Sequence, residues 1–165
     1  MLDVENLPAE LLLLAGWRTK FTTKTVAATV GETSRIGIFN PAQSGLIVVV
    51  TDVWLSANAA IAVAYSTSLT ALTDDSFSGA PRDSRDGVAV NSGAKVAQQQ
   101  TGNTVQRGRL IVQIAETYHH TAKNGLAVLG PGTGFEYGTV VDNEVLNATI
   151  FWRERAALSS EVNFP

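Results

Sequence analysis

The stretch that decides the fold is Val145-Leu-Asn-Ala-Thr-Ile-Phe-Trp-Arg-Glu-Arg155, in the last third of the chain. Apolar and polar positions alternate along it. One set of alternate positions holds Leu146, Ala148, Ile150 and Trp152, and the other holds Asn147, Thr149, Phe151, Arg153 and Arg155. A period of two predicts a β-strand that turns one face toward a core.

The residues before this strand predict its neighbours. Leu126-Ala-Val-Leu-Gly-Pro-Gly-Thr-Gly-Phe-Glu-Tyr137 has the pattern of a short strand, a Gly/Pro turn and a second strand, and Asp142-Asn143 marks another turn. We therefore expect a closing hairpin followed by the long strand.

Similar patterns recur upstream. Residues 24–30 alternate, with Val26, Ala28 and Val30 on one face, and residues 35–39 are expected to form the partner strand. Residues 45–55 are apolar on both faces through Val50, which is typical of a central strand that is covered on each side.

Further strands are expected after residue 60. The inward positions are predicted at Ile61, Val63 and Tyr65, and later at Leu110, Val112 and Ile114. Residues 95–100 form another short strand, residues 66–87 a long irregular loop, and residues 118–125 a polar connection. A loop as long as 66–87 is often a binding or assembly element. Roughly eight to ten short strands predict an all-β antiparallel sandwich or a jelly roll.

The N-terminal residues differ from the rest. Residues 1–20 contain Leu11, Leu12, Leu13, Leu14 and Trp17, with Pro8 placed for a first helical turn and Gly16 for a stop. We expect a short helix or arm over residues 1–20 and a single β domain over residues 21–165. The arm either packs on its own domain or docks on a neighbouring subunit.

Composition excludes several classes of protein. The chain has 165 residues, the size of one domain, and no cysteine, so it has no disulfide and no thiol nucleophile. Charged residues make up 16% of it, against roughly a quarter in ordinary soluble domains, which favours a homo-oligomer with part of its surface buried. A net charge of -3 argues against nucleic acid as a partner. The four-leucine run is far too short to cross a membrane.

No motif indicates catalysis or a cofactor. The turn Gly130-Pro-Gly-Thr-Gly134 lacks the Gly-Lys-Ser/Thr ending of a phosphate loop. Ser92-Gly-Ala-Lys95 fits Ser-x-x-Lys but lacks the companion elements of serine acyl-enzymes. We therefore expect that the protein is not an enzyme and that it binds no cofactor and no metal ion.

Two polar clusters contain side chains of the kinds that bind metal ions. Asp74-Asp75 and Asp83…Asp86 lack the spacing of a calcium loop, so we interpret them as solvated turns. His119 and His120 are adjacent, and on a strand they would point to opposite faces. In a loop the two side chains could bind one ion together. Alternatively, His119 or His120 from several subunits could converge at a symmetry axis.

The motifs Leu129-Gly-Pro-Gly-Thr-Gly134 and Thr149-Ile-Phe-Trp-Arg-Glu-Arg155 resemble the C-terminal end of small virion proteins of tailed bacteriophages. The resemblance implies a β-sandwich or jelly roll of the head surface or the tail, often a trimer. It favours a capsid decoration (cement) protein that is made in the host cytoplasm and binds the major capsid protein on the surface of the virion.

In that hypothesis the interface residues are Leu11, Leu12, Leu13, Leu14 and Trp17 as apolar anchors, with Arg153 and Arg155 as polar ones. The alternatives are a tail or connector subunit, a carbohydrate- or host-surface-binding sandwich, and a small hydrolase that uses Asp75 or Asp86. A carbohydrate site needs exposed aromatic side chains. Trp17 is expected to belong to the arm and Trp54 to a central strand, so neither is expected to be available to bind a sugar.

Overall fold

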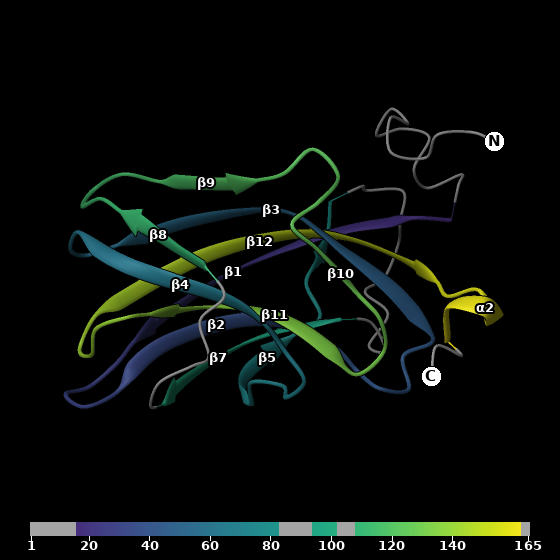
Figure 1. Ribbon diagram of the computed structural model, residues 1–165, viewed down its shortest axis with the longest axis horizontal. Coiled ribbons are helices and arrows are strands. Elements are labelled where there is room, and N and C mark those ends of the chain that lie inside the picture. Colours follow the sequence, from purple (N-terminus) through teal and green to yellow (C-terminus); the bar gives the residue numbers. More distant parts are fainter. Residues whose placement is uncertain (1–15, 83–93, 102–107, 163–165) are drawn as a thin grey trace.

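The computed structural model describes residues 16–82, 94–101 and 108–162, and two antiparallel β-sheets packed face to face make up most of that part of the chain (Figure 1). The strands are β1 (Arg18–Ala27), β2 (Thr33–Asn40), β3 (Leu46–Ala57), β4 (Ile61–Ser68), β5 (Asp74–Phe77), β6 (Ala80–Pro81), β7 (Lys95–Thr101), β8 (Gly108–Val112), β9 (Tyr118–Thr121), β10 (Ala127–Leu129), β11 (Thr133–Thr139) and β12 (Val145–Ala156), followed by the short helix α2 (Ser159–Val162). The predicted all-β sandwich is confirmed.

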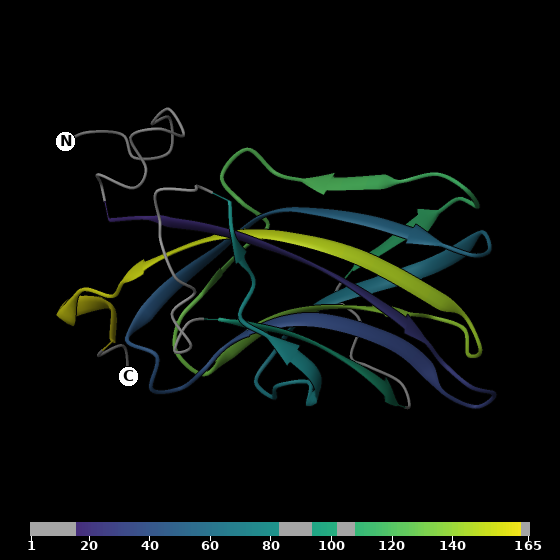
Figure 2. The same cartoon turned by 180° about the vertical axis from the view of Figure 1, so that it is seen from behind.

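The strand order is that of a jelly roll. One sheet has the order β10-β3-β12-β1-β6, with β9 also paired to β3, and the other has the order β5-β7-β2-β11-β4-β8 (Figure 2). Strands β1, β2 and β4 pair with β12, β11 and β8, and β3 pairs with both β9 and β10. The chain is therefore one long antiparallel ribbon folded over on itself. The pairs β12·β3 and β11·β4 close it into two sheets.

This topology corrects the expected hairpins. β10 and β12 lie in one sheet and β11 lies in the other, so the Gly130–Gly134 and Asp142–Asn143 turns join layers and not hydrogen-bonded neighbours. Likewise β2 does not pair with β1. The sequence pattern locates strands and turns, but it does not say which edge a strand joins, because a turn of three residues is long enough to cross the roughly 10 Å between packed sheets.

The core lies between the sheets and follows the predicted alternation. The inward face of β12 is fully buried, as expected, and β3 is a central strand, as expected. The largest apolar contributions from the two sheets come from Ile36, Ile38, Val48, Val50, Val53, Leu55, Val63, Leu129, Phe135, Tyr137, Leu146, Ile150 and Trp152.

Two expected strand positions are wrong because the strands end early. β1 ends at Ala27 and β8 ends at Val112, so Val30 and Ile114 are 82% and 60% exposed. At the other end, β1 begins at Arg18, so residues 18–20 belong to the sheet and not to the arm. Residues 118–121 form β9, and residues 66–87 include β5 and β6, where the sequence indicated only loops.

An ion pair is buried between the sheets. Lys20 and Glu154 face inward from β1 and β12, and their side chains are 2% and 3% exposed, with Nζ 2.5 Å from Oε1. The other carboxylate oxygen of Glu154 accepts hydrogen bonds from Trp152 Nε1 at 3.3 Å and from the Ala94 amide at 3.4 Å. Beyond the ion pair, Lys20 Nζ has no hydrogen-bond partner among the residues that the structure describes.

Asn40, at the end of β2, ties the two sheets together. It is fully buried, and its Nδ2 donates to the carbonyl oxygens of Leu46 at 2.8 Å and Leu129 at 3.0 Å, at the ends of strands in the opposite sheet. The Ser44 hydroxyl donates to its Oδ1 at 2.6 Å. Every polar atom of this amide side chain is thus satisfied, which buried polar groups require for stability.

Candidate functional site

A row of aromatic rings crosses the outer face of the β10-β3-β12-β1 sheet. This aromatic row consists of Phe21 on β1, Phe151 on β12, Trp54 on β3 and His119 on β9. Ring centroids are 5.9 Å apart for Phe21 and Phe151, 4.8 Å for Phe151 and Trp54, and 5.0 Å for Trp54 and His119. The register makes the row, because His119 lies opposite Trp54 and Phe21 lies opposite Phe151 in the ladders.

An open hollow of about 250 Å³ lies beside the aromatic row. Trp54, His119 and Phe151 line it together with three polar residues, Asp52, Arg82 and Thr121. The Arg82 guanidinium lies 5.3 Å from the centre of the Phe151 ring, in a cation–π contact. The hollow thus combines a carboxylate, a guanidinium and a hydroxyl with aromatic walls.

Farther along the same face lies a second group, the tryptophan–arginine cluster, formed by Trp17, Arg153, Arg155 and Glu161. The two guanidinium groups lie over the Trp17 ring at 4.8 and 5.1 Å, and Trp17 is 7% exposed. Trp17 precedes β1, Arg153 and Arg155 share one face of β12, and Glu161 is on α2.

A bidentate ion pair holds α2 against β12. Arg155 Nη1 and Nη2 donate to the two carboxylate oxygens of Glu161 at 2.8 and 2.6 Å, and the Leu158 amide donates to the same carboxylate at 2.8 Å. The hydrogen bonds from Arg155 and then from Leu158 lower the pKa of Glu161 to about 2, and Glu161 in turn raises the pKa of Arg155. The Arg155 fork is therefore already occupied within the chain.

The two histidines point to opposite faces of β9, as expected for adjacent residues on a strand. His119 stacks outside on Trp54, whereas His120 Nδ1 lies 2.7 Å from the hydroxyl of the buried Tyr137. Burial lowers the pKa of His120, so its ring is neutral near pH 7. Burial, and then proximity to Tyr65 and Tyr118, raises the pKa of Tyr137. This arrangement fits a hydrogen-bonded core pair.

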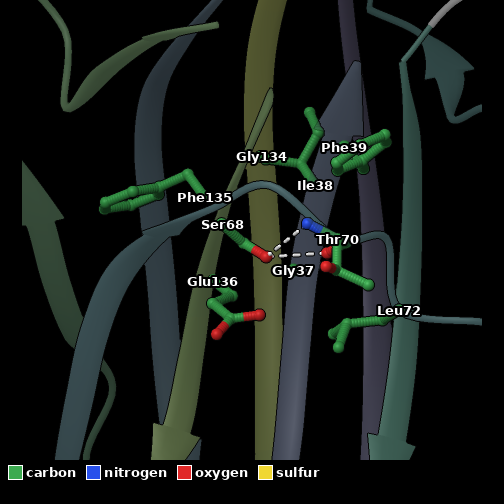
Figure 3. A pocket seen from close by; sticks show the side chains of 9 residues that line it. All are labelled: Gly37, Ile38, Phe39, Ser68, Thr70, Leu72, Gly134, Phe135 and Glu136. Atoms are coloured by element: carbon green, nitrogen blue, oxygen red, sulfur yellow. Dashed lines mark hydrogen bonds between the residues drawn. The ribbon is translucent and has the colours of Figure 1, made fainter. Parts of the chain in front are cut away.

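A very small cavity lies on the outer face of the other sheet, next to Glu136 (Figure 3). Its volume is about 10 Å³, room for one water molecule. Glu136 pairs with Arg35 at 2.5 Å, and its second oxygen has no partner among the described residues. Gly37 and Gly134 line the cavity where a Cβ would clash with Glu136 and Phe39. The cavity is too small for a substrate.

The structure brings together three of the predicted interface residues, Trp17, Arg153 and Arg155, although they lie at opposite ends of the sequence. Leu11, Leu12, Leu13 and Leu14 lie outside the described residues, as do Ser92, Asp83 and Asp86.

Trp54 is 43% exposed and lines the hollow, so the expectation that a central strand makes it unavailable for binding is wrong. Its position could have been found from parity, because Asp52, Trp54 and Ser56 alternate with the buried Val53, Leu55 and Ala57. The contribution of Arg82 had no such signal, since it follows the two-residue strand β6.

Within residues 16–82, 94–101 and 108–162, no group of three or more acidic or histidine side chains is placed to hold a metal ion. None of the helices in the described part of the chain is long and apolar enough to cross a membrane. No protein-family model matches the chain, and no curated protein or solved structure is significantly similar to it.

Proposed function

We propose that the chain is a non-enzymatic virion structural protein, a homo-oligomer, with a trimer favoured, that binds the major capsid protein on the capsid surface and stabilises the shell. A protein that binds only the assembled shell stabilises it by mass action. The jelly roll supports this proposal, because the architecture is common in viral capsid proteins as well as in lectins.

The observation that carries the proposal is the tryptophan–arginine cluster. The Trp17 ring packs under the guanidinium groups of Arg153 and Arg155. The residues that precede Trp17 are therefore joined to the domain at a fixed point on the outer face of the sheet. The four leucines of residues 11–14 lie just before that anchor in the sequence. Trp and Arg are the residues most enriched where protein partners bind tightly.

The test is a deletion that spares the domain. Removing residues 1–15 keeps Trp17 and the buried Lys20, whereas a cut after residue 20 would remove both. We expect the shortened protein to unfold at an unchanged temperature and to lose co-sedimentation with heads of the phage that encodes it. Replacing the four leucines by serine should have the same effect, while Val128→Ser, at a 67% exposed position on β10, should not.

Two results would contradict the proposal. One is undiminished co-sedimentation of the shortened protein with heads. The other is a monomeric mass for the full chain, measured by light scattering over a range of concentrations, because a cement protein of this class is expected to be an oligomer.

A further inference from the structure

We propose that the hollow beside Trp54 is a carbohydrate-binding site that takes one ring of a neutral glycan. The inference does not depend on the proposed virion role. Its residues, Asp52, Trp54, Arg82, His119 and Thr121, are separate from the tryptophan–arginine cluster.

The sheet register fixes the floor and walls of the hollow. Asp52 and Trp54 are two residues apart on β3 and point outward side by side. Thr121 lies opposite Asp52 and His119 lies opposite Trp54 on β9, while Phe151 lies opposite Asp52 on β12. A carboxylate is therefore placed between a hydroxyl and two aromatic rings by backbone pairing, and not by a mobile loop.

The chemistry of the lining selects a neutral polar ligand. The charges of Asp52 and Arg82 cancel, so the hollow favours neither a simple anion nor a simple cation. Asp52 accepts hydrogen bonds, Arg82 donates them and Thr121 does both. A sugar ring offers matching hydroxyl groups along its edge, and its C–H faces carry the partial positive charge that the π-faces of aromatic rings attract.

The shape also favours a sugar over an apolar protein side chain. An apolar side chain in the hollow would strip water from Asp52 and Arg82 without replacing their hydrogen bonds, which is costly. A volume of about 250 Å³ lies just below the range of pockets for drug-sized ligands, which suits a single ring with its neighbours in solvent.

The aromatic wall is already rigid before a ligand arrives. Trp54 is held between His119, whose ring is tilted only 8° from the indole plane, and Phe151. Phe151 is itself backed by Phe21 and covered by Arg82. Because these rings are fixed by one another, binding a ligand costs little side-chain entropy. Even so, 43% of Trp54 stays exposed for contact.

The experiment uses the full chain on an array that carries neutral, sialylated and uronic-acid glycans, followed by calorimetric titration with the best neutral oligosaccharide. We expect neutral glycans to bind and Asp52→Asn to weaken binding by about tenfold or more, because a charge-assisted hydrogen bond is lost. Trp54→Ala should abolish binding. Val128→Ser, on the same outer face but outside the hollow, is the control and should bind normally.

Asp52 is only partly buried, so Asp52→Asn should fold even if Trp54→Ala does not, and thermal unfolding checks both variants. The proposal is overturned if no neutral glycan binds at millimolar concentration, if only acidic glycans bind, or if folded Asp52→Asn binds as well as the parent. The chain without residues 1–15 should retain glycan binding, so loss of head binding and loss of glycan binding are separable results.

Discussion

Removing the charge of Glu154 is expected to destabilise the protein strongly. In Glu154→Gln the shape is kept, but Lys20 becomes a buried cation that has lost its counter-charge among the described residues, since both side chains are at most 3% exposed. Breaking a buried pair in this way costs about 3–5 kcal/mol. For a domain of this size, that corresponds to a fall in the unfolding temperature of roughly 6–20 °C.

Urea unfolding measures this loss directly, at one fixed protein concentration so that any oligomerisation affects all variants alike. Trp152, which donates to Glu154, is a fluorescent reporter at the site. The double variant Lys20→Met/Glu154→Leu should recover most of the stability, because it removes both buried charges. Lys95→Met, at an exposed lysine, is the control and should change the free energy of unfolding by no more than about 0.5 kcal/mol. If Glu154→Gln lowers the free energy of unfolding by less than about 1 kcal/mol, the reasoning is refuted, because a loss that small is typical of a solvated surface ion pair.

Two further changes test the contacts of Arg155 and Tyr137. The pKa of Glu161 is held at about 2, so the ion pair with Arg155 stabilises the protein above the ordinary carboxyl pKa and is lost as the pH falls toward 2. Arg155→Gln should raise the pKa of Glu161 toward 4.5, as followed by NMR titration, and an unmoved pKa would show that Arg155 is not its cause. Tyr137→Phe leaves Nδ1 of His120 without its partner and should cost about 0.5–1.5 kcal/mol in urea unfolding, whereas an unchanged midpoint would show that water replaces the hydroxyl.

Local alternation in the sequence predicted most strands and the inward face of β12, because a side-chain period of two is a property of the strand alone. It did not predict the sheet partners. Whether β11 joins β12 or crosses to the other layer depends on the whole ribbon, and the short turns permit either path. The burial of Glu154 was also missed, since Arg153-Glu-Arg155 has the composition of a solvated strand end and only the pairing with β1 supplies Lys20.

The candidate site was predictable only in part. The side-chain chemistry of Trp17, Arg153 and Arg155 indicates an interface, but these residues meet only because β1 pairs with β12. The hollow was not found, because its residues come from β3, β9, β12 and the segment after β6. Each strand alone shows only an outward polar or aromatic residue. The site exists only once four segments lie side by side.

The pairing of β1 with β12, from Arg18 opposite Glu154 to Ala27 opposite Val145, has a consequence for the speed of folding. The strand at the centre of the first sheet pairs with both β1 and β3, and both ladders join residues that lie far apart in the sequence. The apolar residues 47–50 therefore lack their neighbour on β12 until a long stretch of chain has closed into a loop. Because the entropy of that closure is lost before the contacts form, we expect this sheet to fold slowly and β3 to be prone to aggregation until β12 has paired with it.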